Sequence, residues 1–279
     1  MTTVPPRSVL IWSGLISVLV VMASAAGLTD PRVYELETEN WALQAKGQDL
    51  GNLLAVVVLV VAVLRYRRGS PRAGLVWLGT LLYLIYAFIV YAVAVHLNYL
   101  FLVYIAVLGL SAWAVIFNVS HVRGLGIQYP QGRPRTVAAW VIIATGVMFA
   151  GLWLSELVPS LMTGEVPASL IEAGLWVNPI HVIDLALVLP GFVISGIAAL
   201  QSREHGLFWL APWLVFSVLM GSSIIAAMVL ILVEGDTTAV PATVMVSVVV
   251  AASLLAVRRF LALPLAASTR FRDLPRAAG

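Results

Sequence analysis

Eight stretches of this 279-residue chain are long and apolar enough to cross a lipid bilayer as α-helices. A helix needs roughly 20 mainly apolar residues to cross the hydrocarbon core. The predicted spans are 8–28, 50–66, 75–97, 100–119, 136–158, 180–200, 207–233 and 243–263. The chain is 61% hydrophobic and 10% charged, which is more apolar surface than a soluble domain of this size can bury. The sequence therefore predicts an all-α, polytopic transmembrane helix bundle surrounded by membrane lipid.

The basic residues predict how the chain sits in the membrane. Of its 16 Lys and Arg residues, 14 fall on one side of the membrane if the eight spans alternate in direction. Arg32 and Lys46 fall on the other side, where acidic residues gather. Because Lys and Arg are retained on the cytoplasmic side, both termini are predicted to be cytoplasmic. Fifteen of the 16 are Arg, a bias that fits a GC-rich prokaryotic genome, so the predicted location is a prokaryotic cytoplasmic membrane.

The first span has a second interpretation. Arg7, the apolar stretch and Ala23-Ser24-Ala25 resemble a signal peptide with a small-residue cleavage site. The apolar run continues through Leu28, which is long enough to span the membrane, so we favour an uncleaved helix. A measured mass that lacks the first 25 residues would contradict the eight-span prediction.

Several function classes are disfavoured by what the sequence contains. The Arg residues cluster in short loops between apolar spans, so topology explains them without a nucleic-acid partner. The chain has no Cys, which excludes disulfides and thiolate chemistry. It also has no H-E-x-x-H, G-x-S-x-G, P-loop or dinucleotide-binding motif in a suitable context. The sequence therefore leans away from an enzyme without excluding one, and it does not indicate an oligomeric state.

An internal duplication is predicted from comparison of the chain with itself. At an offset of 135 residues, Glu37 aligns with Glu172, Trp41 with Trp176, Lys46 with His181, and Asp49 with Asp184. The predicted halves are 1–135 and 136–279, with four spans each and the same orientation, in one membrane domain. Halves of this kind are related by a pseudo-two-fold axis along the membrane normal. Trp41 and Trp176 lie outside the predicted spans and are expected at the outer membrane surface.

Polar side chains gather at the predicted outer ends of the helices, and they are the candidate ligand-binding residues. Charge inside hydrocarbon is costly and is expected to face a cavity or a partner. The set consists of Lys46, Gln48, Asp49, His96, Asn98, Glu156, Asn178, His181 and Asp184. The alternative is that these residues cap helices and lie at the membrane interface, which suits an acid at the start of a helix.

Three of these residues are also candidate metal ligands. His181 and Asp184 are three positions apart, so they share one face of a helix. A carboxylate that orients a histidine can support metal binding or proton transfer. With His96, the pair predicts a divalent metal as a candidate cofactor, with zinc as the model case.

Aromatic residues and a proline bear on the same region. Tyr83, Tyr86 and Tyr91 on the third helix could line a cavity. Tyrosines near the interface are more often anchors, and we favour that interpretation, with Tyr83 as the one clear exception in depth. Pro190-Gly191 interrupts the sixth span, and proline removes a helical hydrogen bond. A kink there is predicted to widen a pocket beside the polar residues.

Four segments together carry a resemblance to known proteins. They are WALQAKGQDL (41–50), RGSPRAGLVWLGTLLYLIY (68–86), NYLFLVY (98–104) and HVIDLALVLP (181–190). In these segments the chain resembles a set of multi-span membrane proteins of bacteria and archaea that carry no assigned activity. The resemblance covers most of the chain and implies no catalytic residues. It implies that Gln48-Asp49 and His181-Asp184 belong to the part that makes the sequence recognisable.

The sequence supports three hypotheses of function. The first is binding or transport of a small polar or ionic ligand through an outward-facing pocket between the second, third, fifth and sixth helices. The second is an intramembrane enzyme, with a divalent metal as a candidate cofactor, that uses His181, Asp184, His96 and Asp49. The third is a helper protein without chemistry of its own, whose outer segments bind another membrane protein.

Overall fold

The computed structural model describes residues 7–262 and contains eight helices that are long and apolar enough to cross a membrane. The predicted number of spans is therefore confirmed, and residue 263, the end of the last predicted span, lies outside the described residues. Seven are single helices: α1 (Arg7–Thr29), α2 (Glu39–Arg67), α3 (Pro71–Ala94), α4 (Phe101–Arg123), α5 (Arg133–Thr163), α9 (Glu204–Val233) and α10 (Val240–Leu261). The sixth span is made of α7 (Pro179–Ile183), a π-helical turn η2 (Asp184–Val188) and α8 (Leu189–Leu200). The short elements η1 (Pro31–Val33), α6 (Ala168–Ala173) and η3 (Thr237–Ala239) lie between spans.

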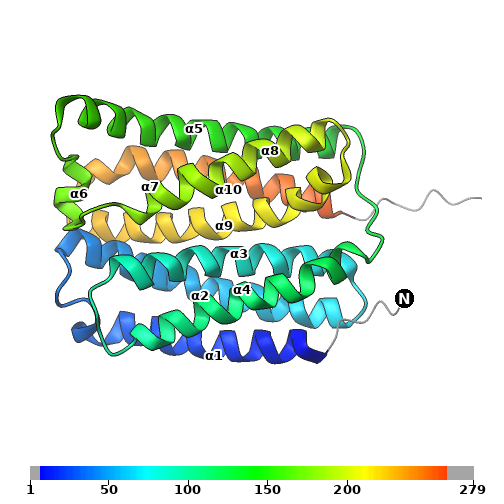
Figure 1. Cartoon of the computed structure of the whole chain (residues 1–279), viewed down its shortest axis with the longest axis horizontal. Helices are drawn as coiled ribbons and strands as arrows, with labels where there is room; N and C mark the ends of the chain where they lie inside the picture. The colour runs from blue at the N-terminus through cyan, green and yellow to red at the C-terminus, as the bar shows by residue number, and fades with distance from the viewer. Residues whose placement is uncertain (1–6, 263–279) are drawn as a thin grey trace, which may run out of the picture.

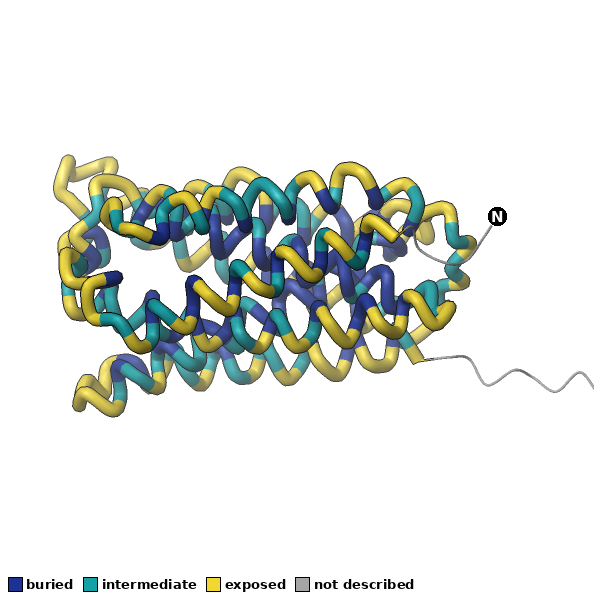
Figure 2. The backbone as a smooth tube through the Cα atoms, turned by 90° about the horizontal axis from the view of Figure 1, so that it is seen from below, coloured by how far each residue is buried: buried dark blue, intermediate teal, exposed yellow. Residues whose placement is uncertain are grey.

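The helices run side by side along one axis of the molecule (Figure 1). Buried positions lie along the inside of the bundle, and exposed positions lie on its outside and at its ends (Figure 2). Many exposed side chains at mid-helix are large and apolar, such as Val57, Trp113 and Val147. Such a surface is expected where lipid is the solvent, so the architecture is that of a multi-pass membrane protein.

Two groups of four helices share the same order of neighbours. In one, α1 packs on α2, α2 on α3, α3 on α4 and α4 on α1; in the other, α5, α8, α9 and α10 follow the same cycle. Figure 1 shows the first group in one half of the bundle and the second in the other. The predicted boundary after residue 135 falls in the first turn of α5. Descent of the two halves from one duplicated unit remains a prediction.

The two groups meet most closely where α2 packs against α9. A Cβ atom on Gly47 would lie 2.3 Å from the backbone of Ala227, and one on Gly51 would lie 2.3 Å from the Cβ of Ser223. Small residues such as these glycines let the backbones of membrane helices come into close contact. The close contact fixes α2, which carries Gln48 and Asp49, against the second half of the protein.

Helix α2 starts eleven positions before the predicted span, at Glu39 rather than residue 50. Thr38 caps it, because its hydroxyl accepts a hydrogen bond from the backbone N–H of Trp41. Trp41 was expected at the membrane surface, but it is buried and its indole N–H donates to the carbonyl of Ala94 at 2.7 Å. Trp176 is exposed, as expected. The two Trp residues therefore occupy different environments.

The sixth span departs from the α-helix near the predicted break at Pro190. The backbone N–H of Leu189 donates to the carbonyl of Asp184, five residues earlier, which makes a π-helical turn. Pro190 has no N–H to continue the usual ladder, and a shift to five-residue spacing is a recognised response in helices near functional sites. The turn begins at Asp184 and sets the direction of its side chain.

The bundle has an acidic end and a basic end. The acidic end contains η1, α6 and η3, and the basic end contains the α2–α3, α4–α5 and α8–α9 connections. Asp30 at the acidic end accepts hydrogen bonds from Arg32 and, at 2.7 Å, from the hydroxyl of Tyr99. The guanidinium of Arg32 also lies 5.7 Å from the centre of the Tyr99 ring. This contact ties η1 to the α3–α4 connection.

The Asp30 contact is expected to weaken in acid. Hydrogen bonds from Arg32 and then Tyr99 lower the pKa of Asp30 far below its ordinary value of 3.8. A lowered pKa gives stability that is present above the ordinary value and is lost as pH falls through the folded-state value. Hydrogen exchange of residues 30–38, corrected for intrinsic rates, should therefore be faster at pH 7 in Asp30→Asn than in wild type. Wild type and variant should converge well below pH 3.8, and equal exchange rates at pH 7 would contradict this role.

Candidate functional site

A cavity of about 360 Å³ lies between the two helix groups in the half of the bundle near the acidic end. Its wall includes residues of α2, α3, α5 and the sixth span, which are the four helices that the sequence indicated. Helices α9 and α10 complete the wall and were not expected there. Cavities of this size suit small organic molecules.

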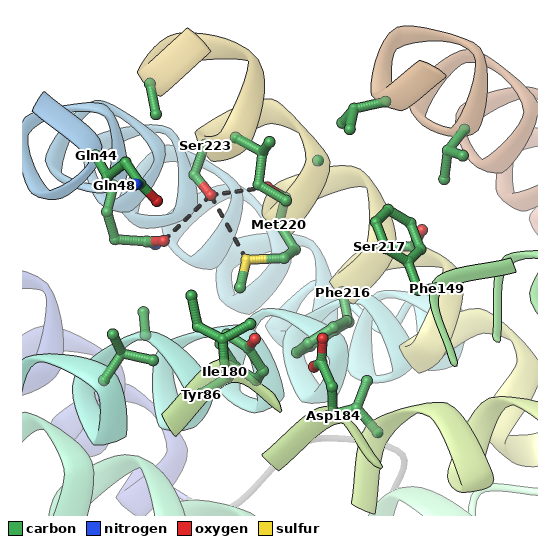
Figure 3. A pocket seen from close by; sticks show the side chains of 18 of the residues that line it. Gln44, Gln48, Tyr86, Phe149, Ile180, Asp184, Phe216, Ser217, Met220 and Ser223 are labelled. Atoms are coloured by element: carbon green, nitrogen blue, oxygen red, sulfur yellow. Dashed lines mark hydrogen bonds between the residues drawn. The ribbon is translucent and has the colours of Figure 1, made fainter. Parts of the chain in front are cut away.

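The cavity wall is mostly apolar and aromatic, with a few polar groups (Figure 3). The aromatic residues are Trp41, Tyr86, Tyr91, Phe149, Trp153, Phe192 and Phe216. The polar side chains are those of Gln44, Gln48, Thr145, Asp184, Ser217 and Ser223. Among the described residues that line the cavity, Asp184 is the one that can carry a full charge at neutral pH, since no Lys, Arg, His or Glu lines it.

The carboxylate of Asp184 is held at the cavity wall by an aromatic donor. The residue is 8% exposed, and the indole N–H of Trp153 on α5 donates to its Oδ2 atom at 2.8 Å. The hydroxyl of Tyr86 on α3 lies beside the same carboxylate. An ionisable group at this depth in a membrane protein is expected to have a function.

His181 and Glu156 form a pair beside this site. The Nε2 atom of His181 lies 3.8 Å from Oε2 of Glu156, and the other carboxylate oxygen of Glu156 accepts a hydrogen bond from Ser169. The ring of Trp153 packs 4.6 Å from the ring of His181. Trp153 thus lies between the pair and Asp184, and neither His181 nor Glu156 lines the cavity.

Asp49 lies in the core, away from the cavity wall. It is 2% exposed and accepts hydrogen bonds from the hydroxyls of Tyr34 at 2.7 Å and Tyr91 at 2.9 Å. The backbone of Gly27 on α1 presses against it, since a Cβ there would lie 2.1 Å from its Oδ2 atom. Asp49 is therefore neither a helix cap nor a direct cavity residue.

A chain of hydrogen bonds joins the Asp49 region to the cavity. The amide of Asn52 lies 3.4 Å from the Tyr91 hydroxyl, and the Tyr83 hydroxyl donates to Asn52 at 3.1 Å. The amide of Gln48 donates to Tyr83 at 2.6 Å, and Ser223 donates to Gln48 at 3.3 Å. Gln48, Tyr91 and Ser223 all line the cavity.

The other candidate residues have structural roles or lie elsewhere. His96 contacts Glu37 through its backbone N–H and its ring, at 2.7 and 3.0 Å. Asn98 accepts from the N–H of Leu100, and Asn178 caps α7 by accepting from Ile180. Lys46 is half-buried on α2 and does not line the cavity. Capping, the alternative interpretation, accounts for Asn178, whereas Asn98 forms a turn just before α4, whose N-cap is Leu100.

The structure does not bring the three candidate metal ligands together. Within residues 7–262, no three or more His, Asp or Glu side chains form a group that could hold a metal ion. His96 pairs with Glu37 at the acidic end, whereas His181 pairs with Glu156. A divalent metal at His96, His181 and Asp184 therefore gains no support from the geometry.

The main site residues that sequence reasoning missed are aromatic. Tyr86 and Tyr91 were expected as interface anchors, which is wrong, because both are buried and line the cavity. Tyr34 and Trp153, the donors to the two buried Asp residues, were not singled out. Buried hydroxyl and indole groups need hydrogen-bond partners, so the nearby carboxylates were the one available signal.

Comparison with known proteins finds no matching family model, no matching curated protein and no matching solved structure. The cavity and the residues around it are therefore the features of this protein that point to a function.

Proposed function

We propose that this membrane protein binds a small organic cation, an amine with an apolar body, in the cavity beside Asp184. The observation that carries the proposal is a single carboxylate in a cavity that is otherwise uncharged and mostly apolar and aromatic. A charged group removed from water is stable only when it is paired or well hydrogen-bonded. A ligand ammonium group would supply the missing positive charge. The sequence predicted a small polar or ionic ligand, and we now propose that this ligand carries a positive charge.

The aromatic wall supports a cation in the same position. Tyr86, Trp153 and Phe216 come from three different helices around Asp184. Faces of aromatic rings attract organic ammonium groups, most strongly when water is excluded. Apolar residues such as Val90, Ile224 and Val246 line the rest of the cavity and would cover the body of the ligand.

The test uses three probes of one shape and different charge: 4-phenylbutylamine, 4-phenyl-1-butanol and 4-phenylbutyrate. Binding to purified protein in nanodiscs is measured by calorimetry at pH 7. We expect the amine to bind at least about tenfold more tightly than the alcohol, and the acid to bind most weakly. Asp184→Asn should weaken amine binding by roughly tenfold to a hundredfold, the range for a hydrogen bond to a charged group.

Glu165→Gln is the matched control, because Glu165 is an exposed acid outside the cavity. It should bind the amine as wild type does. Equal affinity for amine and alcohol, or an unchanged amine affinity in Asp184→Asn, would contradict the proposal.

Transport of the bound cation is the second function to test. Toward the basic end, the core is filled by large side chains that are fully buried, including Trp77, Leu81 and Phe208. Passage through the membrane would require these side chains to move apart. Uptake of 4-phenylbutylamine by proteoliposomes, lost in Asp184→Asn, would establish transport; saturable binding without uptake would limit the function to binding.

A further inference from the structure

The Asp49 region contains more hydrogen-bond acceptors than hydrogens when Asp49 is ionised. The hydroxyl of Tyr91 lies 2.9 Å from Oδ1 of Asp49 and 3.1 Å from the carbonyl oxygen of Ala45. A tyrosine hydroxyl has one hydrogen, so it can donate fully to one of these two oxygens. The second contact is fully satisfied only if Asp49 brings a hydrogen of its own.

Two arrangements of hydrogens fit the same heavy-atom positions. With Asp49 ionised, Tyr91 donates to Oδ1, and the Ala45 carbonyl keeps only its helical partner. With Asp49 protonated on Oδ1, the acid donates to the Tyr91 oxygen, and Tyr91 turns its hydrogen to Ala45. One proton is gained on Oδ1 and one O–H rotates, so the change needs no movement of the backbone.

We propose that Asp49 is a proton-binding site, and that Tyr91 couples its occupancy to the cavity. Tyr91 and Ala45, whose contact changes with the proton on Asp49, both line the cavity. The coupling rests on the proposed function, whereas the proton site does not. The protein would then bind its cation in a manner that depends on pH.

The surroundings of Asp49 fit a proton better than a metal ion. The α1 backbone at Gly27 lies against Oδ2, and two tyrosine hydroxyls already contact the carboxylate at hydrogen-bond distance. No Lys, Arg or His forms an ion pair with Asp49 in the part of the chain that the structure describes. A buried carboxylate without a cationic partner is costly in its charged form, so both protonation states are accessible to it.

Among the groups that face one another around Asp49, Asp49 itself is the one that we expect to gain or lose a proton. The titratable side chains that face it are Tyr34 from the η1 segment, Tyr83 and Tyr91 from α3, and Tyr104 from α4. Helix α1 presents Ser24, which does not titrate, and Ser223 on α9 contacts Gln48. Lys46 lies three residues away on α2. Burial, and then the charge of Asp49, raise the pKa of Tyr34 well above its ordinary value. Tyr34 therefore stays a hydrogen donor.

The proton site is tested by infrared spectroscopy of the full-length protein in lipid. A protonated carboxylic acid has a carbonyl stretch that a carboxylate lacks. We expect a wild-type band that disappears as pH rises, with one component missing in Asp49→Asn and retained in Asp184→Asn. Tyr91→Phe, which removes only an oxygen, should move that component to higher pH, because hydrogen bonds to a charged acceptor are the stronger ones.

Two results would overturn the proton site. One is a titrating band that is identical in wild type and Asp49→Asn; if Asp49→Asn does not fold, an unshifted band in Tyr91→Phe decides the same question. The other is a titration that moves with sodium concentration at constant ionic strength, which would assign the site to a metal cation.

The coupling is tested with 4-phenylbutylamine across the pH range of that titration. Ionised Asp49 adds negative charge near the cavity, so amine affinity should rise as the Asp49 band disappears. Asp49→Asn should lose this rise while binding the amine. An unchanged pH profile in Asp49→Asn would refute the coupling. If the amine does not bind wild type, the proposed function fails, and the infrared titration still decides the proton site.

Discussion

Replacing Met220 with tryptophan is expected to abolish binding of 4-phenylbutylamine, with a loss of at least about a hundredfold in affinity. Met220 lies on α9, and its side chain extends into the cavity near Gln48 and Ser223 (Figure 3). An indole at this position would occupy space in a cavity of about 360 Å³. Because the ring fills existing space, the overpacking that destabilises a dense core should be limited.

Met220→Leu is the matched control, since exchanges that conserve volume usually cost less than about 1.5 kcal/mol. This variant should bind the amine within a few-fold of wild type. A cooperative thermal unfolding transition is the check that both variants are folded. Wild-type affinity in Met220→Trp would mean that the probe binds outside the cavity.

The eight spans could be predicted because the bilayer imposes a length and a composition on each helix. The start of α2 could not be predicted in this way. Gln44, Lys46, Gln48 and Asp49 lower the hydropathy of its first turns, yet the cap at Thr38 and the buried Trp41 make them helical. The mean hydropathy of a segment indicates whether lipid or water surrounds it. It does not identify helical segments whose polar residues are buried inside a bundle.

The polar candidate residues have two kinds of role in the structure, and contacts with residues far away in sequence determine which role each one has. Asp49 and Asp184 were singled out for their expected position near hydrocarbon, and both are buried in the structure. Asn98 and Asn178 had the same sequence signal, but Asn178 caps α7 and Asn98 accepts from the N–H of Leu100 in the turn before α4. A polar residue at a helix end serves either purpose, and tertiary contacts determine which.

The cavity itself was predicted only in part, because apolar residues that line a cavity look like those that face lipid. Met220, Ile224 and Val246 on α9 and α10 have no sequence feature that separates them from lipid-facing neighbours. Membrane helices lack the polar stripe that orients a helix in a soluble protein. The rotation of each helix about its axis therefore had to come from the structure.

The second large effect is expected from Gly27→Val, which should destabilise the fold by on the order of 2–5 kcal/mol, since overpacking and unpaired buried polar groups each cost about 1–3 kcal/mol. A Cβ on Gly27 would lie 2.1 Å from Oδ2 of Asp49 and 2.7 Å from the Tyr34 hydroxyl. The substitution would force α1 away from α2 or push the carboxylate out of its hydrogen bonds. Either change leaves polar groups unpaired in the core.

Gly14→Val on the same helix provides the comparison, because no atom lies within 4 Å of a Cβ at Gly14. It makes the same chemical change in open space, so its thermal unfolding in detergent should stay close to that of wild type. Equal losses in the two variants would assign the effect to valine in α1 rather than to contact with Asp49. A loss confined to Gly27→Val, together with a shifted Asp49 infrared band, would show that α1 holds the carboxyl group in place.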